Sequence, residues 1–387
     1  MRRGDARGLS QGRYRMRIGL SASVLDPAYN NGRPDGMSVC TRHLLAGLTR
    51  SGHEVRPYSF AGEAHGIPNW RRFPASYGVM AGLGIATSGI SRFGPPVDIF
   101  HVTDYRSVPM RCPVVATLYD AIPMVFPEMA NPRFRRFKNF VLRRAAGFAD
   151  HVIAISRYSV AELVEHFDVP ESRISVVYCG VGSDWLAPLP EADWHESLVR
   201  RGLRPGYYLF VGILQPRKNL ERVLQAHDTL PAELRRERPL VVVGKAGWRC
   251  EALLEKLMAK VASGEAYWLN DVHGITELRH LYAGAGVFVF PSLYEGFGLP
   301  VLEAFASGVP VVTSNTTSLP EVSAGVGFEV DPASVEEIAF AMERALLDDE
   351  RAWRIPAGRQ RAAGMGWDAC VEGTLSVYRR VLGEGNA

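Results

Sequence analysis

The sequence lacks the features of several common protein classes. Its five cysteines lie far apart and form no Cys-x-x-Cys pair and no His/Cys spacing typical of a metal site. Their odd number and scatter indicate reduced thiols, as in a cytoplasm. The cysteines are Cys40, Cys112, Cys179, Cys250 and Cys370. We therefore expect no disulfide framework.

Long hydrophobic runs are absent as well. No uninterrupted apolar run reaches the roughly 18–20 residues that a membrane-spanning helix needs, and the stretch at 79–90 is interrupted by Gly, Ser and Thr. The first fifteen residues carry five arginines, but no apolar segment of a signal peptide follows them. We expect residues 1–15 to be a disordered basic leader and the folded chain to begin at Met16.

The sequence also has almost no excess of one charge sign. Its 44 Lys and Arg residues nearly balance 41 Asp and Glu residues, and the formal net charge is +3. Electrostatic partners must therefore be sought in local clusters, and we expect no nucleic-acid partner. Apolar residues make up 47% and charged residues 22%, the balance of a soluble globular protein. The length of 387 residues suits two domains of about 150–200 residues each.

Short apolar segments alternate with stretches of helical periodicity in both halves of the chain. Strand candidates lie at residues 16–23, 53–60, 97–102, 113–118 and 151–155, and then at 207–212, 239–244, 267–270, 287–290 and 309–313. Between the two series, residues 180–190 lose periodicity and collect Gly, Pro and Asp. The pattern predicts an α/β fold with two Rossmann-like domains, 16–190 and 200–365, that face a central cleft. Ligands of such sheets bind at the carboxyl ends of the strands.

A basic pair follows the strand expected at 207–211. Gly212 ends this strand, and the missing side chain lets another group approach the backbone. Arg217 and Lys218 then stand at the expected start of the next helix, where free amide N–H groups favour an anion. A guanidinium fork together with an ammonium suits a diphosphate. The alternative is a basic helix start that is simply solvated.

A glycine-containing loop follows a later apolar strand. Gly296 and Gly298 allow a tight turn with exposed N–H groups before a helix, which makes this junction a second candidate phosphate site. A carboxylate at Glu295 would repel phosphate and would instead hydrogen-bond to sugar hydroxyls. Glu303 lies eight positions later in an otherwise apolar stretch. Its partner is either a ribose diol or, as a core glutamate, a backbone group or an arginine.

Five segments together resemble a known family. They are EGFGLPVLEA, VGILQPRKN upstream of it, SNTTSLPEV downstream, and VIAISRYSVAELVEHF followed by ISVVYCGV in the first half. In this order and on these expected elements, they resemble the retaining family-4-type glycosyltransferases (glycosyl transferases group 1) of GT-B fold. The likeness runs from about Met16 to Leu382.

The resemblance implies a role for each matching residue. Arg217 and Lys218 would neutralise the donor diphosphate and stabilise the leaving group, Glu295 would hold the donor sugar, and Glu303 would bind the ribose. The backbone of the Gly-rich loop would contact phosphate and sugar at Phe297, Gly298 and Leu299. Residues 366–387 would form a helix that crosses back to the first domain and takes part in closing the cleft.

The first domain is expected to bind the acceptor. Gly36 ends a loop after the first strand, where the family has a Gly-rich loop against the donor phosphates; a plain surface turn is the alternative. Tyr119 and Asp120 end a buried strand, where family members often have His-Asp. Asp120 would orient an acceptor hydroxyl or the sugar, and the role of the replaced histidine stays open. His101 is either a cleft residue or a satisfied structural histidine, and Glu321 either lies near the cleft or is a structural cap.

Members of this family transfer the sugar with retention of anomeric configuration. No carboxylate stands out as a nucleophile, so we expect a front-face reaction in which the departing diphosphate helps to deprotonate the acceptor hydroxyl. Arg217 and Lys218 would stabilise the charge that develops on the leaving group of an oxocarbenium-like transition state. No metal and no cofactor are expected, because the sequence has no Asp-x-Asp motif and two basic side chains are available for neutralisation.

A basic and aromatic segment at residues 133–144 predicts an amphipathic helix. Its basic side chains are Arg133, Arg135, Arg136, Lys138, Arg143 and Arg144. Such a helix could rest on anionic lipid and bring the site to a lipid-linked acceptor. The alternative is a surface helix that packs its aromatic side chains on the sheet. We expect a cytoplasmic protein, either free or peripheral on the inner face of the membrane.

The leading hypothesis is a retaining glycosyltransferase that moves a hexose from a nucleotide-diphosphate sugar to a saccharide or lipid-linked acceptor, in the synthesis of surface polysaccharide, lipopolysaccharide or glycolipid. General likeness alone points to GDP-mannose as the donor. The alternatives are a nucleotide-sugar epimerase of the same fold, a phosphorylase, and a non-catalytic nucleotide-sugar-binding protein. A phosphorylase would need a pyridoxal lysine motif, which we do not find. An oxidoreductase is disfavoured because no Gly-x-Gly-x-x-Gly follows the first strand.

Overall fold

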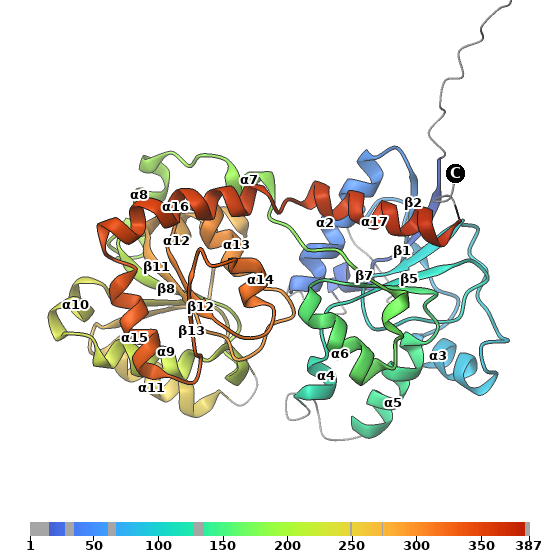
Figure 1. Cartoon of the computed structure of the whole chain (residues 1–387), viewed down its shortest axis with the longest axis horizontal. Coiled ribbons are helices and arrows are strands. Elements are labelled where there is room, and N and C mark those ends of the chain that lie inside the picture. The colour runs from blue at the N-terminus through green and yellow to red at the C-terminus, as the bar shows by residue number, and fades with distance from the viewer. Residues whose placement is uncertain are drawn as a thin grey trace, which may run out of the picture.

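The computed structural model describes residues 15–27, 35–60, 67–126, 135–247, 250–272 and 274–383. These residues form two parallel sheets with helices on both faces, and the two lobes lie side by side along the long axis of the molecule (Figure 1). Nearly all of the expected leader, most of the loop before Gly36 and the first two residues of the basic segment at 133–144 lie outside the described residues.

The first sheet has seven strands in the order β3-β2-β1-β4-β5-β6-β7. The strands are β1 (Arg17–Ser21), β2 (Glu54–Ser59), β3 (Arg71–Arg72), β4 (Ile99–Val102), β5 (Val114–Leu118), β6 (His151–Ala154) and β7 (Ile174–Val176). Its helices are α2 (Gly36–Arg50), α3 (Tyr77–Ala86), α4 (Ile122–Val125), α5 (Arg135–Ala146) and α6 (Arg157–Phe167), with short 3-10 turns η1 (Ser23–Leu25) and η3 (Glu171–Arg173). All the strand pairs are parallel.

This sheet separates two hydrophobic cores. Successive side chains of a strand point to opposite faces, so the neighbours Ile99 and Phe100 on β4 enter different cores. Leu44 and Leu48 of α2 cover one face, and Leu142 of α5 belongs to the core of the other. Because both faces are covered, the central strands are apolar without alternation, as the sequence pattern predicted for a parallel sheet.

The second sheet has six parallel strands in the order β10-β9-β8-β11-β12-β13. The strands are β8 (Tyr207–Val211), β9 (Leu240–Val243), β10 (Ala266–Leu269), β11 (Ala285–Phe290), β12 (Val311–Ser314) and β13 (Phe328–Val330). Its helices are α9 (Leu220–Thr229), α10 (Ala232–Glu237), α11 (Glu251–Ala262), α12 (Ile275–Gly284), α13 (Leu299–Ala306), α14 (Leu319–Ser323), α15 (Val335–Arg344) and α16 (Asp348–Ala363). The strand order reverses between β8 and β11, and such a switch point opens a crevice for a ligand.

The connection between the sheets is more structured than the loss of periodicity indicated. It contains α7 (Ser183–Leu186) and α8 (Glu191–Arg200). Leu198 of α8 is buried in the core with Tyr207 and Leu281 of the second sheet and its helix α12, so residues 191–200 pack as part of the second domain. Helix α8 thus fills the gap that the expected domain bounds left between residues 190 and 200, and the sequence analysis did not predict it.

The chain crosses between the domains twice, and the two crossings touch. Val181 N donates to Met365 O at 2.9 Å. A Cβ on Gly180 would lie 2.4 Å from the backbone carbon of Gly366, so only glycine permits this approach. After the second crossing, α17 (Trp367–Val381) lies on the first domain beside α2 (Figure 1).

Helix α17 completes the first domain's core. Val371, Leu375 and Tyr378 are buried together with Ile18 and Leu20 of β1. Residues 366–387 thus return to the first domain as far as the structure describes them.

Candidate active site

A buried cluster of charges lies where two loops of the second domain meet. The Glu295 carboxylate accepts a hydrogen bond from Lys218 Nζ at 2.6 Å and lies 3.1 Å from Arg217 Nη1. Glu295 is 7% exposed and Lys218 is 8% exposed. A carboxylate this buried is costly unless it is paired and hydrogen-bonded, and here it has two cationic partners.

The two basic residues lie in a 3-10 turn, η4 (Pro216–Lys218), just before α9 rather than in its first turn as expected. Asn219 ends this turn in the left-handed region, with φ of 63°, which asparagine tolerates better than most residues. Its side-chain Nδ2 donates to Pro291 O at 2.8 Å and to Pro332 O at 2.7 Å. Asn219, which the sequence analysis did not single out, therefore fixes the basic turn against the loop after β11.

Burial and pairing act in opposite directions on this cluster. Burial lowers the pKa of Lys218 to about 8, against the opposing effect of Glu295. Burial would raise the pKa of Glu295, but the charges of Lys218 and Arg217 outweigh it and hold that pKa below its usual value. Lys218 Nζ also lies 4.6 Å from the ring centroid of Phe290, a cation–π contact. Near neutral pH Glu295 therefore stays ionised and Lys218 stays protonated.

The Gly-rich loop is held in place by close packing. Gly298 has φ of 119° and caps α13, and a Cβ there would lie 2.7 Å from Leu319 Cδ2. A Cβ on Gly296 would lie 2.6 Å from Tyr119 O of the first domain. Ser318 Oγ can donate at 2.8 Å to the carbonyls of Glu295 and Phe297. Gly298 thus allows a positive φ, and Gly296 allows a close contact between the two domains.

Glu303 lies on α13 and lines a cavity between the domains. Tyr282 OH donates to Glu303 Oε2 at 3.3 Å. Burial raises the pKa of Glu303 to about 7, although the Tyr282 hydrogen bond opposes the shift. The carboxyl group can therefore act as hydrogen-bond acceptor or donor near neutral pH.

The cavity measures about 660 Å³, within the usual range of small-molecule sites. Of the candidate residues, Gly212, Leu299 and Glu303 line it. Its second-domain walls include the carboxyl ends of β8, β9 and β10, where a ligand was expected. The charged cluster adjoins it, since a Cβ on Gly212 would lie 3.7 Å from Lys218 Cδ.

Further lining residues escaped the sequence analysis. Lys245 and Asn270 follow β9 and β10, and the rule that ligands bind at strand ends would have found them. Arg42 and His43 come from α2 of the first domain, with no motif around them. The His43 ring stacks on Trp367, with centroids 4.6 Å apart and planes 5° apart.

Asp120 follows β5 and lies against the Gly-rich loop. A Cβ on Gly296 would lie 3.0 Å from Asp120 Cβ. Tyr105 OH donates to Asp120 Oδ1 at 2.9 Å, and Ile122 N donates to the same oxygen at 3.0 Å. Burial raises the pKa of Asp120, and the nearby Arg217 charge acts against this. The structure thus brings Asp120 to the charged cluster from the opposite domain.

Asp120 does not line the cavity itself, and neither do the other first-domain candidates. His101 is fully buried, with Nδ1 2.6 Å from Tyr378 OH and Nε2 2.8 Å from Thr117 Oγ1, and burial lowers its pKa to about 3. This is the structural alternative foreseen for it. Tyr119 is 7% exposed and packs in a core that includes Cys40.

Gly36 is the first residue of α2 and does not line the cavity. Asp35 caps this helix, accepting a hydrogen bond from Ser38 N at 2.9 Å.

Two Rossmann-like sheets with a ligand-sized cavity at their facing edges, and a basic cluster beside that cavity, define a protein of the GT-B class. Residues 199–361 match the family described as Glycosyl transferases group 1, and residues 34–185 match Glycosyltransferase Family 4. This chain therefore belongs to the glycosyl transferases group 1 and is a glycosyltransferase, as the sequence motifs indicated.

Similar proteins agree with this assignment. O-antigen chain mannosyltransferase B of Escherichia coli is 36% identical over 270 residues, 68% of this chain and 70% of that protein. Serotype-specific mannosyltransferase WbdA of Escherichia coli is 34% identical over 247 residues, 61% of this chain but only 29% of WbdA. The structure of Anabaena HepE in complex with UDP-glucose has a TM-score of 0.73 and 18% identity, covering 94% of this chain and 100% of HepE. The GT-B fold predicted from the sequence is confirmed.

Proposed function

We propose that this glycosyltransferase moves a mannosyl group from GDP-mannose to a saccharide or lipid-linked acceptor in surface-polysaccharide synthesis. The observation that carries the proposal is the buried Arg217–Lys218–Glu295 cluster beside the interdomain cavity. The two Escherichia coli relatives support mannose as the sugar and polysaccharide as the product, since both are mannosyltransferases and one is named for the O-antigen chain.

The cluster suits a diphosphate next to a sugar. Lys218 and Arg217 are both within ion-pair distance of Glu295. When the donor binds, its phosphate oxygens would accept some of the hydrogen bonds of the two cations, which now pair with Glu295. Glu295 would then accept a hydrogen bond from a hydroxyl of the donor sugar. Phe297, Gly298 and Leu299 would contact the donor through their backbone. Glu303, on the cavity wall, would hold the ribose diol.

A retaining front-face reaction fits these charges. Glu295 is held by two cations, which makes its carboxylate a poor nucleophile. The departing diphosphate would accept the proton of the acceptor hydroxyl, while Arg217 and Lys218 stabilise the charge left on it. Asp120, which lies against the Gly-rich loop from the first domain, would orient the acceptor hydroxyl. With two cations at the leaving group, the reaction would need no metal.

A nucleotide screen tests the donor assignment. Calorimetric titration with GDP, UDP and NAD should show binding of GDP in preference to UDP and no tight binding of NAD. Transfer from GDP-mannose should continue in the presence of a chelator, and proton NMR of the product should show the α-anomeric configuration of the donor. Preference for UDP would overturn the donor, a β-linked product would overturn retention, and tight NAD binding alone would overturn the function.

Helix α5 also supports a peripheral membrane location. Phe137 is 66% exposed and Phe140 is 48% exposed. The alternative, an ordinary surface helix, would instead pack these aromatic side chains on the sheet. Arg144 lies over the Phe140 ring, 5.7 Å from its centroid, and Arg143 pairs with Asp168. Within the described residues, no helix is long and apolar enough to span a membrane.

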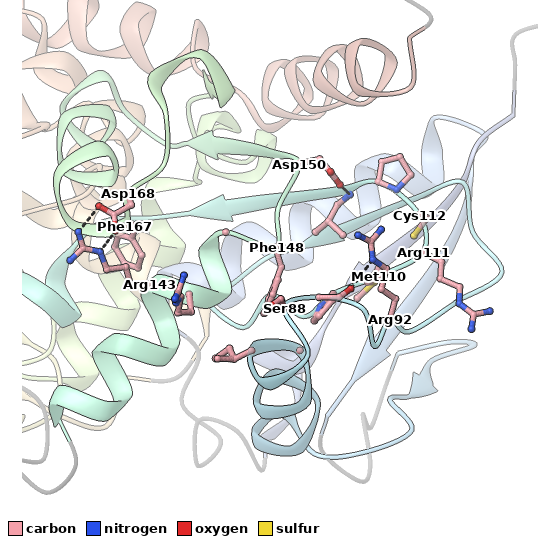
Figure 2. Close-up of a pocket in the computed structure, with 18 of the residues that line it drawn as sticks. Ser88, Arg92, Met110, Arg111, Cys112, Arg143, Phe148, Asp150, Phe167 and Asp168 are labelled. Carbon is pink, nitrogen blue, oxygen red and sulfur yellow. Dashed lines mark hydrogen bonds and ion pairs between the residues drawn. The ribbon is translucent and has the colours of Figure 1, made fainter.

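A second apolar helix lies beside α5. Val79 and Leu83 of α3 are 53% and 52% exposed. Between α3 and α5 lies a pocket of about 990 Å³, with Arg92 and Arg111 at one end and Arg143 at the other (Figure 2). The residues that precede β5 and β6 line it. The pocket therefore lies at the amino-terminal ends of these strands, on the side of the sheet opposite the cleft. This surface combines apolar and basic side chains, which suits an anionic bilayer.

Vesicle binding tests this location. The protein should co-sediment with phosphatidylglycerol vesicles and not with phosphatidylcholine vesicles. The double variant Phe137→Ser, Phe140→Ser should lose most of the binding and keep its activity on a soluble acceptor. Val199→Ser is the matched control, since Val199 is 71% exposed on α8 of the other domain. Equal loss in the control, or no binding by the unmodified protein, would contradict the proposal.

A further inference from the structure

The N-terminus of α6 in the first domain is capped by a side chain of the second domain. Glu321 of α14 accepts from Arg157 N at 2.8 Å and from Tyr158 N at 2.7 Å, using one carboxylate oxygen for each. Tyr178 OH donates to the same carboxylate at 3.2 Å. The next amide, Ser159 N, is capped within the first domain by Ser156 Oγ at 3.1 Å. A carboxylate at a helix N-terminus is favoured by the helix dipole as well as by these hydrogen bonds.

A second contact joins the same helix to the Gly-rich loop. Tyr294 OH donates to Glu162 of α6 and accepts from Ala121 N at 3.2 Å. Ser159 Oγ lies 3.3 Å from Gly296 O, as a donor to that carbonyl. The first two turns of α6 therefore hold both α14 and the Gly-rich loop of the facing domain, and Figure 1 shows α14 at the edge of its lobe that faces the first domain.

These interdomain contacts are continuous with the charged cluster. Tyr294, Glu295 and Gly296 are consecutive, and the outer two bond to the first domain while the middle one bonds to Lys218. Arg217 Nη1 also donates to the Tyr294 carbonyl at 3.0 Å. A rotation that separates the domains would therefore pull on the loop that holds Glu295 against its cations.

We infer that Glu321 and α6 form a latch for the closed cleft, and that the engaged latch sets the geometry of Arg217, Lys218 and Glu295. Glu321 is thus a positioning residue for transfer, although no part of it touches the cavity. The latch closes when the Glu321 carboxylate accepts hydrogen bonds from the first two amides of α6 and Tyr294 OH donates to Glu162. It opens for exchange of donor and product. The expected effect on kcat rests on the proposed donor, whereas the closing of the two domains by the latch does not depend on it.

Variants of the latch test the inference by two independent measurements. In Glu321→Ala, the radius of gyration from small-angle scattering should increase because the open form gains population. The kcat should fall by roughly tenfold to a hundredfold, as for a misplaced catalytic group, with a smaller change in the Kd of GDP. The radius of gyration and kcat of Glu321→Gln should lie between those of the unmodified protein and of Glu321→Ala, because an amide offers one acceptor oxygen for the two N–H groups. Glu343→Ala, an exposed carboxylate on α15, is the matched control.

Glu162→Gln and Tyr294→Phe test the second contact, and they keep the inference open to refutation should Glu321→Ala not fold. Each should shift the radius of gyration and kcat in the same direction as Glu321→Ala. A purely structural cap would lower the melting temperature and leave both quantities unchanged in the folded protein. That outcome, or an enlarged radius with full activity, would overturn the latch. Failure of GDP to bind any form would instead count against the proposed donor, since scattering reports on the latch by itself.

Discussion

The two walls of the cleft are built in different ways. In the second domain, charged side chains that follow β8 and β11 point toward one another, so that Glu295 pairs with Arg217 and Lys218. In the first domain, His101 of β4 and Tyr119 after β5 turn into the interior instead. The second-domain wall, where we propose that the donor binds, is thus held by ion pairs. The first-domain wall, proposed for the acceptor, is lined by residues of α2, and Asp120 meets the charged cluster without lining the cavity. This contrast predicts where substitutions affect chemistry and where they affect only stability.

The largest effect is expected at the proposed donor wall. Lys218→Ala should lower kcat by roughly 10²–10³-fold, because a group that stabilises the leaving diphosphate is removed and Glu295 keeps a single cation. Lys256→Ala, which breaks an exposed ion pair with Glu221, is the control and should be nearly silent. Steady-state kinetics with GDP-mannose measures both. A loss of less than about tenfold in Lys218→Ala would mean that the donor phosphates bind elsewhere.

Glu303 should make stability depend on pH. Its pKa is raised from 4.5 to about 7, so between these values the folded protein keeps a proton that the unfolded chain has released. Stability should therefore fall as pH rises through this window, by up to about 3 kcal/mol. Glu303→Gln, neutral throughout, should remove this part of the slope. Melting temperatures of both proteins between about pH 5 and pH 8 test this, and parallel curves would contradict it.

His101 should affect stability without affecting chemistry. His101→Ala removes the bonds to Tyr378 and Thr117 and leaves a void, which should cost about 2–4 kcal/mol. Urea unfolding measures the loss, and the kcat of the folded fraction should stay as in the unmodified protein. If stability is kept and activity is lost, His101 belongs to the acceptor wall after all, and the contrast between the walls fails.

Tyr119 should give the smallest effect. Its side chain packs against Cys40 and Cys179 rather than facing the cavity, so Tyr119→Phe should cost about 1 kcal/mol or less and leave kcat unchanged. Thermal unfolding and kinetics measure the two quantities. A clear drop in kcat would show that the hydroxyl takes over the task of the histidine that the family resemblance led us to expect at this position.

The sequence was most informative where a function depends on near neighbours in the chain. The alternation of strands and helices predicted both sheets, because parallel strands buried on both faces are uniformly apolar. Arg217, Lys218, Glu295 and Glu303 were predicted as site residues because each lies in a recognisable motif that follows a strand. The meeting of Glu295 with Lys218 could not be deduced, since it depends on the order of β8 and β11 in the sheet.

Residues positioned by long-range packing were missed. Asn219 is one polar residue among many until its bonds to Pro291 and Pro332 are seen. Arg42 and His43 reach the cavity only because α2 faces the other domain. The role of Glu321 stayed open for the same reason, because its partners on α6 lie more than 150 positions earlier in the chain.

The touching crossings at Gly180 and Gly366 make the second domain an insertion within the first. The chain leaves the first domain after β7 and returns in α17, whose Val371, Leu375 and Tyr378 complete the core around β1. During synthesis, the ribosome therefore releases every part of the second domain before the last helix of the first. The domain that begins the chain is the last to be finished, and a chain truncated at Met365 would leave the first domain, not the second, with an uncovered core.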